Sequence, residues 1–314
     1  LVIYVDGINA TIIGSEFEEC SAVVNGGAVY IHGENTTVQD SDFNKDSVSS
    51  STSNGGAIYV DGINAKIIGS EFDECSAKQQ GGSIFIKGAN TNITGSNFTK
   101  SYISADTSSA RGGAIYVDGQ KTTIAKSEFE DCRANQDGGA IYIKGQFANV
   151  MDSNFNGSQA KNGAGLYISG NNATVNGSTF IHGRAGDCGG GIYSDGIGSK
   201  VYNSNFTDNK ARHTEVQNTG GGAIFWKGGA KDDTIENCTF TANDGGFGGA
   251  IRWVNGKDSQ ASGLIKNCTF ISNTGFKGST VSWASANTAH ITLCKFFSNV
   301  AENHGGIYAG THTS

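Results

Sequence analysis

The 314-residue sequence contains no proline and a single methionine. Without proline, its turns must be built by Gly, Asn and Asp, and 47 glycines are available for them. No apolar run approaches the roughly 18 residues that a membrane-spanning helix requires, and the first residues form neither a basic nor an apolar signal region. We therefore expect no direct membrane insertion by this segment.

The sequence also lacks a Cys-x-x-Cys pair, and its seven cysteines are an odd number. This is weak evidence for a disulfide framework and none for a zinc site. Acidic residues outnumber basic ones, and the net charge of -7 argues against nucleic acid and anionic membranes as partners. With 37% hydrophobic residues, the chain can bury a core, so disorder is not expected.

Repetition dominates the rest of the sequence. The stretch Gly-Gly-Ala-Ile-Tyr at 55–59 recurs in recognisable form from end to end, and a phenylalanine follows most of its copies. Aligning the copies gives one aliphatic column: Ile3, Val29, Ile58, Ile84, Ile115, Ile141, Leu166, Ile192, Ile224, Ile251, Val281 and Ile307. A fixed period of this size is typical of stacked repeat architectures.

Short segments rich in β-branched residues, separated by Gly and Asn, predict two or three strands per period and no helix. Strands that recur once per period pair in parallel with the next turn, and parallel crossovers are overwhelmingly right-handed. The sequence therefore predicts an all-β, right-handed parallel β-helix (solenoid) of about eleven to twelve turns, forming one domain over residues 1–314. Because Leu1–Tyr4 already lie inside a repeat, we expect a fragment of a longer surface protein.

Alternation along the first strand of each period assigns side chains to faces. The aliphatic column should point inward, and the aromatic column beside it, which also holds Arg252 and Ser282, should point outward. Trp226, Trp253 and Trp283 are expected in the core, with a flipped strand as the alternative. One outward column alternates acid with base, which predicts cross-strand ion pairs: Asp6, His32, Asp61, Lys87, Asp118 and Lys144.

Gly-Gly-Ala-Ile followed by Phe-x-x-Asn, as at 206–209, 240–243 and 270–273, resembles the repeats of chlamydial polymorphic outer membrane proteins. It is equally similar to the adhesin-like surface proteins of methanogenic archaea. The resemblance covers nearly the whole chain and implies a right-handed β-helix displayed outside the cell for attachment. In earlier turns Cys or Asp and Ser replace this Asn, as at Asp46 and Ser158.

Two features are candidate contact surfaces. The aromatic column would form an exposed strip that stacks on sugar rings: Tyr30, Tyr59, Tyr116, Tyr142, Tyr167 and Tyr193. The alternative is an aromatic ladder that only stabilises the sheet. Insertions at 47–54, 102–111 and 212–219 leave one side of the solenoid, where such proteins often bind partners. They add Tyr102, Arg111 and His213 as candidate binding residues.

No catalytic residues are assigned. In galacturonase-like enzymes, clustered carboxylates precede His-Gly and a basic residue, whereas here Asp232-Asp233 follows 182–184. The six histidines share no metal-ligand spacing, so neither a metal nor a cofactor is expected. We expect a non-catalytic, extracellular, adhesin-like or surface-display stalk at the cell surface. Its partner would be a cell-surface glycan or a protein on another cell.

Two alternatives stay open. One is a carbohydrate-active β-helix enzyme, a polysaccharide lyase or hydrolase, whose site would lie near His182, Arg184, Asp208 and His213. The other is a structural sheath or filament protein that self-associates end to end or laterally. Size analysis of polysaccharides after incubation with the protein would separate an enzyme from the two non-catalytic interpretations.

Overall fold

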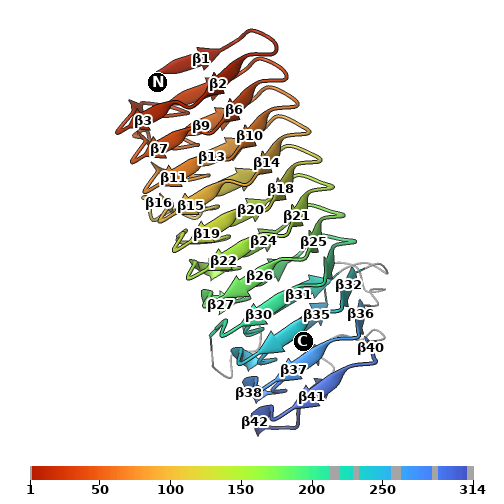
Figure 1. The fold of residues 1–314 in the computed structure, drawn as a ribbon. Coiled ribbons are helices and arrows are strands. Elements are labelled where there is room, and N and C mark those ends of the chain that lie inside the picture. Colours follow the sequence, from red (N-terminus) through yellow and green to blue (C-terminus); the bar gives the residue numbers. More distant parts are fainter. Residues whose placement is uncertain (1, 213–218, 229–232, 256–262, 285–288, 310–314) are drawn as a thin grey trace.

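The computed structural model describes residues 2–212, 219–228, 233–255, 263–284 and 289–309, which wind into a parallel β-solenoid (Figure 1). Three long sheets of twelve, eleven and eleven strands run along its length. Each strand pairs in parallel with the equivalent strand of the neighbouring turns. Over the described ranges the regular elements are all strands. The predicted fold class is therefore confirmed.

The first long sheet carries the aliphatic and aromatic columns. Its strands are β1 (Ile3–Val5), β5 (Val29–Ile31), β9 (Ile58–Val60), β13 (Ile84–Ile86), β17 (Ile115–Val117), β20 (Ile141–Ile143), β24 (Leu166–Ile168), β28 (Ile192–Ser194), β31 (Ile224–Gly228), β35 (Ile251–Asn255), β39 (Val281–Ala284) and β43 (Ile307–Ala309).

The second long sheet supplies one aliphatic residue per turn to the core. Its strands are β2 (Thr11–Ile13), β6 (Thr37–Gln39), β10 (Lys66–Ile68), β14 (Asn92–Thr94), β18 (Thr123–Ala125), β21 (Asn149–Met151), β25 (Thr174–Asn176), β29 (Lys200–Tyr202), β32 (Asp233–Glu236), β36 (Gly263–Lys266) and β40 (Ala289–Thr292).

The third long sheet carries the phenylalanine column. Its strands are β3 (Glu16–Glu18), β7 (Asp42–Asn44), β11 (Glu71–Asp73), β15 (Asn97–Thr99), β19 (Glu128–Glu130), β22 (Asn154–Asn156), β26 (Thr179–Ile181), β30 (Asn205–Thr207), β33 (Thr239–Thr241), β37 (Thr269–Ile271) and β41 (Lys295–Phe297).

Short strands line the corner that follows the third sheet. They are β4 (Ser21–Ala22), β8 (Ser47–Val48), β12 (Ser76–Ala77), β16 (Tyr102–Ile103), β23 (Gln159–Asn162), β27 (Arg184–Cys188), β34 (Asp244–Phe247), β38 (Thr274–Lys277) and β42 (Val300–Asn303). The insertions at 47–54 and 102–111 begin in β8 and β16, so both leave from this corner, as predicted. Residues 213–218 of the third insertion lie outside the described residues.

The core is built from columns of like side chains stacked in register. Phe72 pairs with Phe43 on one side and Phe98 on the other, and neighbouring rings along this column lie 4.6–5.1 Å apart between centroids. The three tryptophans join the same core, as predicted, with 0–3% of each side chain exposed: Trp226, Trp253 and Trp283. Ring stacking thus continues the hydrophobic core from turn to turn.

The two glycines of a Gly-Gly pair have different structural roles. Gly55 adopts a positive φ of 65°, which glycine reaches without strain. A Cβ on Gly56 would overlap the carbonyl oxygen of Gly82 in the next turn. The first glycine therefore makes the bend, and the second lets neighbouring turns approach closely.

A buried asparagine ladder joins the last turns. The Oδ1 of Asn243 accepts hydrogen bonds from the backbone N–H and the Nδ2 of Asn209, both at 3.0 Å. Its own Nδ2 donates to the carbonyl of Phe206 at 3.0 Å and to Oδ1 of Asn273. Each side chain thus satisfies backbone groups of the neighbouring turn.

The acid–base column forms the predicted ion pairs. The Nζ of Lys87 lies 2.7 Å from Oδ1 of Asp61, and the Nζ of Lys144 lies 2.8 Å from Oδ1 of Asp118. His32 stands 3.5 Å from Asp61 in the same column. Because the Lys side chains are more than half exposed, each pair contributes under about 1 kcal/mol.

Candidate functional site

The aromatic column is not the exposed strip that the sequence suggested. Tyr59, Tyr116 and Tyr142 are only 8%, 3% and 6% exposed, and Tyr30, Tyr167 and Tyr193 are half-buried: the expectation of exposure was wrong. From Tyr4 to Phe225 successive rings stack with centroids 4.5–5.3 Å apart. Since each interior ring has a neighbour on both faces, the column leaves no ring face there for a sugar.

Polar groups also close the edges of this ladder. The guanidinium of Arg111 lies 5.2 Å from the ring centroid of Tyr142, and its Nε donates to Asp137 at 3.0 Å. On the ladder itself, the hydroxyl of Tyr167 donates to Asp195 at 3.1 Å. Burial is the main cause that raises the pKa of Asp195. Arg111 therefore acts as a cover of the ladder in this structure.

The same column hides a cation. Arg252 was expected to face solvent, yet it is 1% exposed. Its Nη1 donates to Ser282 at 2.5 Å, and its guanidinium lies 4.7 Å from the ring centroid of Phe247. Desolvation lowers its pKa to about 10. Phe247 and Ser282 pack against the guanidinium and help to bury a charge that strand alternation alone predicted to be exposed.

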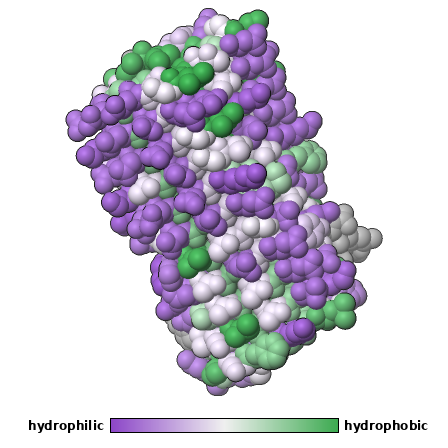
Figure 2. Space-filling view, viewed as in Figure 1, coloured by the Kyte–Doolittle hydropathy of each residue, from purple (hydrophilic) through white to green (hydrophobic). Residues whose placement is uncertain are grey.

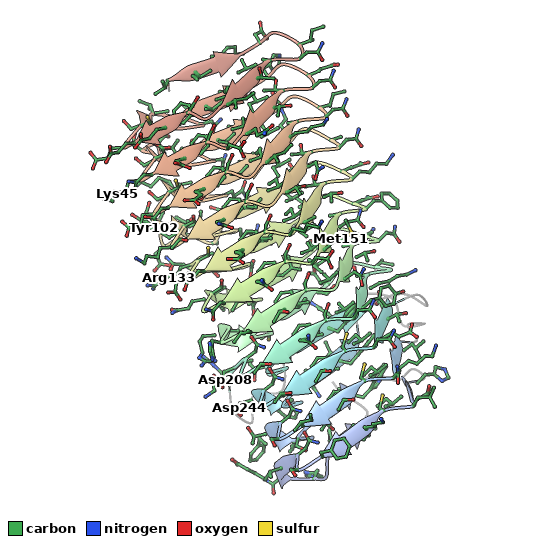
Figure 3. The ribbon with its side chains drawn as sticks, in the orientation of Figure 1. Lys45, Tyr102, Arg133, Met151, Asp208 and Asp244 are labelled. Atoms are coloured by element: carbon green, nitrogen blue, oxygen red, sulfur yellow. The ribbon has the colours of Figure 1, made fainter. Side chains whose placement is uncertain are left out.

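The remaining predicted contact residues lie elsewhere. Tyr102 is 40% exposed at the corner, and Figure 3 places it on the same edge of the solenoid as Arg133, Asp208 and Asp244. His213 lies outside the described residues. Figure 2 shows that this edge is mostly hydrophilic.

A charged cluster occupies the same edge, three to four turns after Tyr102. Asp208 receives the Nη2 of Arg184 at 2.9 Å, and His182 and Lys210 approach the same carboxylate at 3.8 and 3.6 Å. Desolvation opposes the shift, but the hydrogen bond and charge of Arg184, with Lys210 and His182, hold the pKa of Asp208 below its usual range. Three of the four residues named for an enzyme site thus come together.

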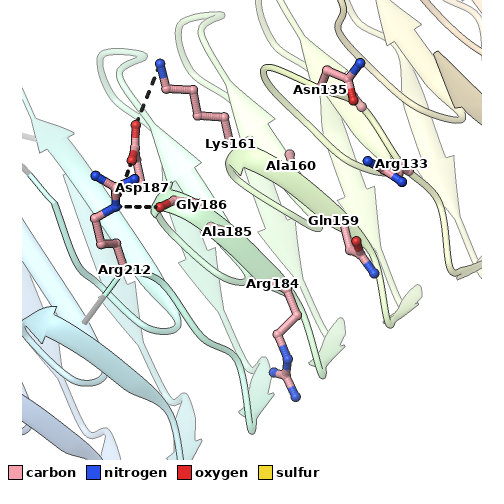
Figure 4. Close-up of a pocket in the computed structure, with 11 residues that line it drawn as sticks. Arg133, Asn135, Gln159, Ala160, Lys161, Arg184, Ala185, Gly186, Asp187 and Arg212 are labelled. Atoms are coloured by element: carbon pink, nitrogen blue, oxygen red, sulfur yellow. Dashed lines mark hydrogen bonds and ion pairs between the residues drawn. The ribbon is translucent and has the colours of Figure 1, made fainter. Parts of the chain in front are cut away.

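An open groove of about 670 Å³ runs across this corner over several turns (Figure 4). It is lined by polar and small side chains: Arg133, Ala134, Asn135, Gln159, Ala160, Lys161, Arg184, Ala185, Gly186, Asp187 and Arg212. Four of these side chains are cationic and one is a carboxylate. The groove is therefore a basic strip on an acidic protein.

Parallel pairing places the groove residues in register. Arg133 bridges to Gln159, Gln159 pairs with Arg184, and Arg184 bridges to Lys210. These residues form one column, with neighbours roughly 4.7–4.9 Å apart. The pairing of β23 with β27 shifts between Ala160 and Asn162, which marks a bulge in β27, where Gly186 and Asp187 stand opposite Lys161.

Asp187 organises the other side of the groove. Lys161 approaches its carboxylate at 3.7 Å from the preceding turn, and Arg212 approaches at 3.3 Å from the following turn (Figure 4). The Nε of Arg212 also donates to the carbonyl of Gly186 at 3.1 Å. One carboxylate therefore holds two cations from neighbouring turns at the groove wall.

Two further groups of residues bear on chemistry. In the described part of the chain, no three His, Cys, Asp or Glu side chains gather as a metal site. Cys238 and Cys268 are 1% exposed, and each thiol donates to the backbone carbonyl two residues before it, so they behave as buried thiols.

In the part of the chain that the structure describes, no helix has the length and apolar character needed to cross a bilayer.

A profile of the family described as "Right handed beta helix region" matches residues 113–314, which agrees with the predicted hand. No curated protein matches the sequence. Among solved structures, the chain is similar to a mutant tailspike protein of E. coli bacteriophage HK620, solved with a hexasaccharide, at 12% identity and a TM-score of 0.38. The alignment covers 96% of this chain and 60% of the tailspike, so it spans less than two thirds of that protein.

A second similar structure is a PL6 alginate lyase, solved with a trisaccharide. It shares 12% identity, with 94% of this chain and 83% of the lyase covered and a TM-score of 0.33.

Proposed function

This chain belongs to the right-handed beta-helix family, and we propose that it is a non-catalytic, extracellular rod of the adhesin or surface-display type. It presents its side wall to a glycan or protein on another cell. The regular stacking of like residues gives a stiff support along the solenoid. The likeness of its Gly-Gly-Ala-Ile and Phe-x-x-Asn repeats to chlamydial and methanogen surface proteins supports a place at the cell surface.

The observation that carries this proposal is the groove between Arg133 and Arg212. It lies on the side wall and draws its residues from successive turns. Its volume falls in the range of about 300–1,000 Å³ that is usual for ligand sites. Its open form suits a partner that extends along the solenoid.

The carboxylates at the groove favour binding over hydrolysis. Glycosidases use a pair of carboxyl groups, one of which must hold a proton as general acid. Here Asp187 is the carboxylate that lines the groove, and it is committed to Lys161 and Arg212. Asp208, beside the groove, is kept ionised by Arg184 and its neighbours, which makes it a weak proton donor.

A polysaccharide lyase or hydrolase is the second candidate. It is favoured by the convergence of His182, Arg184 and Asp208. In such an enzyme His182 would transfer a proton to or from the substrate, and Arg184 would bind an anionic group of the substrate. The two functions differ in whether the polymer is shortened.

The test is to incubate the chain with a panel of polysaccharides and to follow both retention of the polymer and its length by size-exclusion chromatography. We expect retention of at least one polymer at constant length. Shortened chains would overturn the non-catalytic proposal in favour of the lyase or hydrolase. Failure to retain any polymer, together with failure to bind intact cells, would overturn the proposal of an adhesin.

A further inference from the structure

We infer that the groove at β23 and β27 binds a linear anionic polysaccharide, whose carboxylate or sulfate groups pair with Arg133, Lys161, Arg184 and Arg212. This inference rests on the proposed function, because it names the partner that the side wall takes. It is carried by the charge, the spacing and the chemistry of the groove lining.

The first argument is the concentration of positive charge. The chain carries a net charge of -7, yet four of the groove's charged side chains are cationic and one is acidic. A strip of one sign attracts ligands of the other sign even when the whole protein has the wrong sign. The groove is therefore selective for anions over neutral polymers.

The second argument is the spacing of the cations along the axis. Arg133 and Arg184 belong to one column and lie two turns apart, roughly 9–10 Å at the spacing of parallel strands. Lys161 and Arg212 belong to the other wall, also from turns on either side of Asp187. Cations thus alternate between the walls turn by turn, which suits an extended chain with a charge on each repeating unit.

The third argument is the state of the Arg212 side chain. Arg212 contacts Asp187 and the Gly186 carbonyl through Nε, which carries one of the five N–H donors of a guanidinium. The other donors lie on its two Nη atoms and can form the forked pair that planar carboxylates and sulfates accept. Asp187 therefore orients Arg212 without using its terminal donors.

The fourth argument separates a polysaccharide from nucleic acid and from neutral glycans. Proteins that bind single-stranded nucleic acid stack its bases on aromatic side chains. The residues that line this groove include no aromatic ring, and between its charged side chains lie the small residues Ala160, Ala185 and Gly186. Asn135 and Gln159 offer amides to sugar hydroxyls. Affinity must then come from charge and hydrogen bonds, which an anionic sugar chain supplies.

The experiment uses the whole chain immobilised on a sensor and four polymers: polygalacturonate, dextran sulfate, neutral dextran and single-stranded oligo-dT. We expect binding of polygalacturonate or dextran sulfate, weakened by added salt, and little binding of dextran or oligo-dT. Comparison of the first two polymers tells which anion the groove prefers. Binding of oligo-dT at equal or greater strength would overturn the inference in favour of nucleic acid.

Variants place the binding at the groove. The double variant Arg133→Gln and Arg212→Gln should bind the anionic polymer roughly tenfold more weakly, as expected for two partly exposed charge pairs. As controls, Lys66→Gln and Lys121→Gln remove exposed cations far from the groove, and together they change the net charge equally. This double control should bind as the wild type does. Circular dichroism confirms that the variants remain folded.

The outcomes separate this inference from the function on which it rests. Equal losses in the groove variant and in the control would overturn the groove as the site. Undiminished binding of the anionic polymer by the groove variant, or no binding of it by the wild type while cells or neutral glycans still bind, would overturn the inference and leave the adhesin proposal standing. If no polymer and no cell binds, both fail.

Discussion

Asp46 accepts a hydrogen bond from the backbone N–H of Cys20 at 2.7 Å, while its second carboxylate oxygen is buried without a hydrogen-bond partner. Asp46 occupies the position that Asn209, Asn243 and Asn273 hold in later turns. Desolvation by burial is the main cause that raises its pKa to about 7. In this early turn an aspartate thus replaces the ladder asparagine, and one of its two carboxylate oxygens lacks a hydrogen bond.

Asp46→Asn should stabilise the protein by about 1–3 kcal/mol near neutral pH, since it gives a buried polar atom a partner. The new Nδ2 would face the carbonyl of Phe17, as the Nδ2 of Asn209 faces that of Phe180 at 2.9 Å. Urea denaturation measures the change. The reverse exchange, Asn209→Asp, is the matched control and should destabilise. A loss of stability in Asp46→Asn would contradict this account of the carboxylate.

The advantage of Asp46→Asn should depend on pH. Asp46 has a raised pKa in the folded protein, so the folded state binds the proton more tightly than the unfolded state does. Wild-type stability therefore falls as pH rises from about 4, the usual carboxyl value, to about 7. The difference in melting temperature between variant and wild type should be small at pH 4 and full above pH 7. A difference that stays constant over this range would show that the carboxyl does not titrate there.

Asn243→Ala should cost on the order of 3 kcal/mol or more. It removes an acceptor shared by two donors of Asn209 and a donor to the carbonyl of Phe206, all of them buried. Buried groups left without partners carry a desolvation penalty of about 1–3 kcal/mol each. The control is Asn154→Ala, on the exposed face of β22, which should change stability by less than about 0.5 kcal/mol. Equal effects of the two changes would mean that the ladder contributes no special stability.

Tyr116→Ala should lower the free energy of unfolding by about 3–5 kcal/mol, the usual cost of removing a buried aromatic ring. Tyr116→Phe should be nearly neutral, because Phe85 already occupies the neighbouring position of the ladder with centroids 5.1 Å apart. Neither change should alter binding of polysaccharide by the folded protein. A folded Tyr116→Phe variant that no longer binds polysaccharide would return the aromatic column to the list of contact surfaces.

The columns of the solenoid could be predicted from the sequence because each turn repeats the same local choices. Stacked Phe72, core Trp226 and the Asp61–Lys87 pair all follow from period and alternation. Burial of Tyr116 and Arg252 did not follow, because a side chain that points away from the core was equated with an exposed one. Stacked neighbours cover the ring faces, and side chains such as Arg111 cover the ring edges.

The groove was mostly missed for a different reason. Arg184 was named beside His182 and Asp208, but Arg133, Lys161 and Asp187 were not. Their meeting depends on the corner after the third sheet, where turn lengths vary and a bulge shifts the pairing of β23 with β27. Alignment on the Phe positions sets the column of Arg133, Gln159 and Arg184, but it does not set the register at the bulge, where Asp187 lies. A basic residue recurring at a fixed distance after Phe129, Phe180 and Phe206 was the signal available in the sequence.

The acid–base column sets a rule of parity for how this solenoid can change its length. Lys87 separates Asp61 from Asp118, so deletion of its single turn would bring two carboxylates side by side. Like charges directly opposite one another destabilise a sheet. Loss or gain of two turns preserves the alternation and leaves every neighbour unlike. In this part of the chain, the rod can therefore be lengthened or shortened in even steps without an electrostatic penalty, and in odd steps only with one.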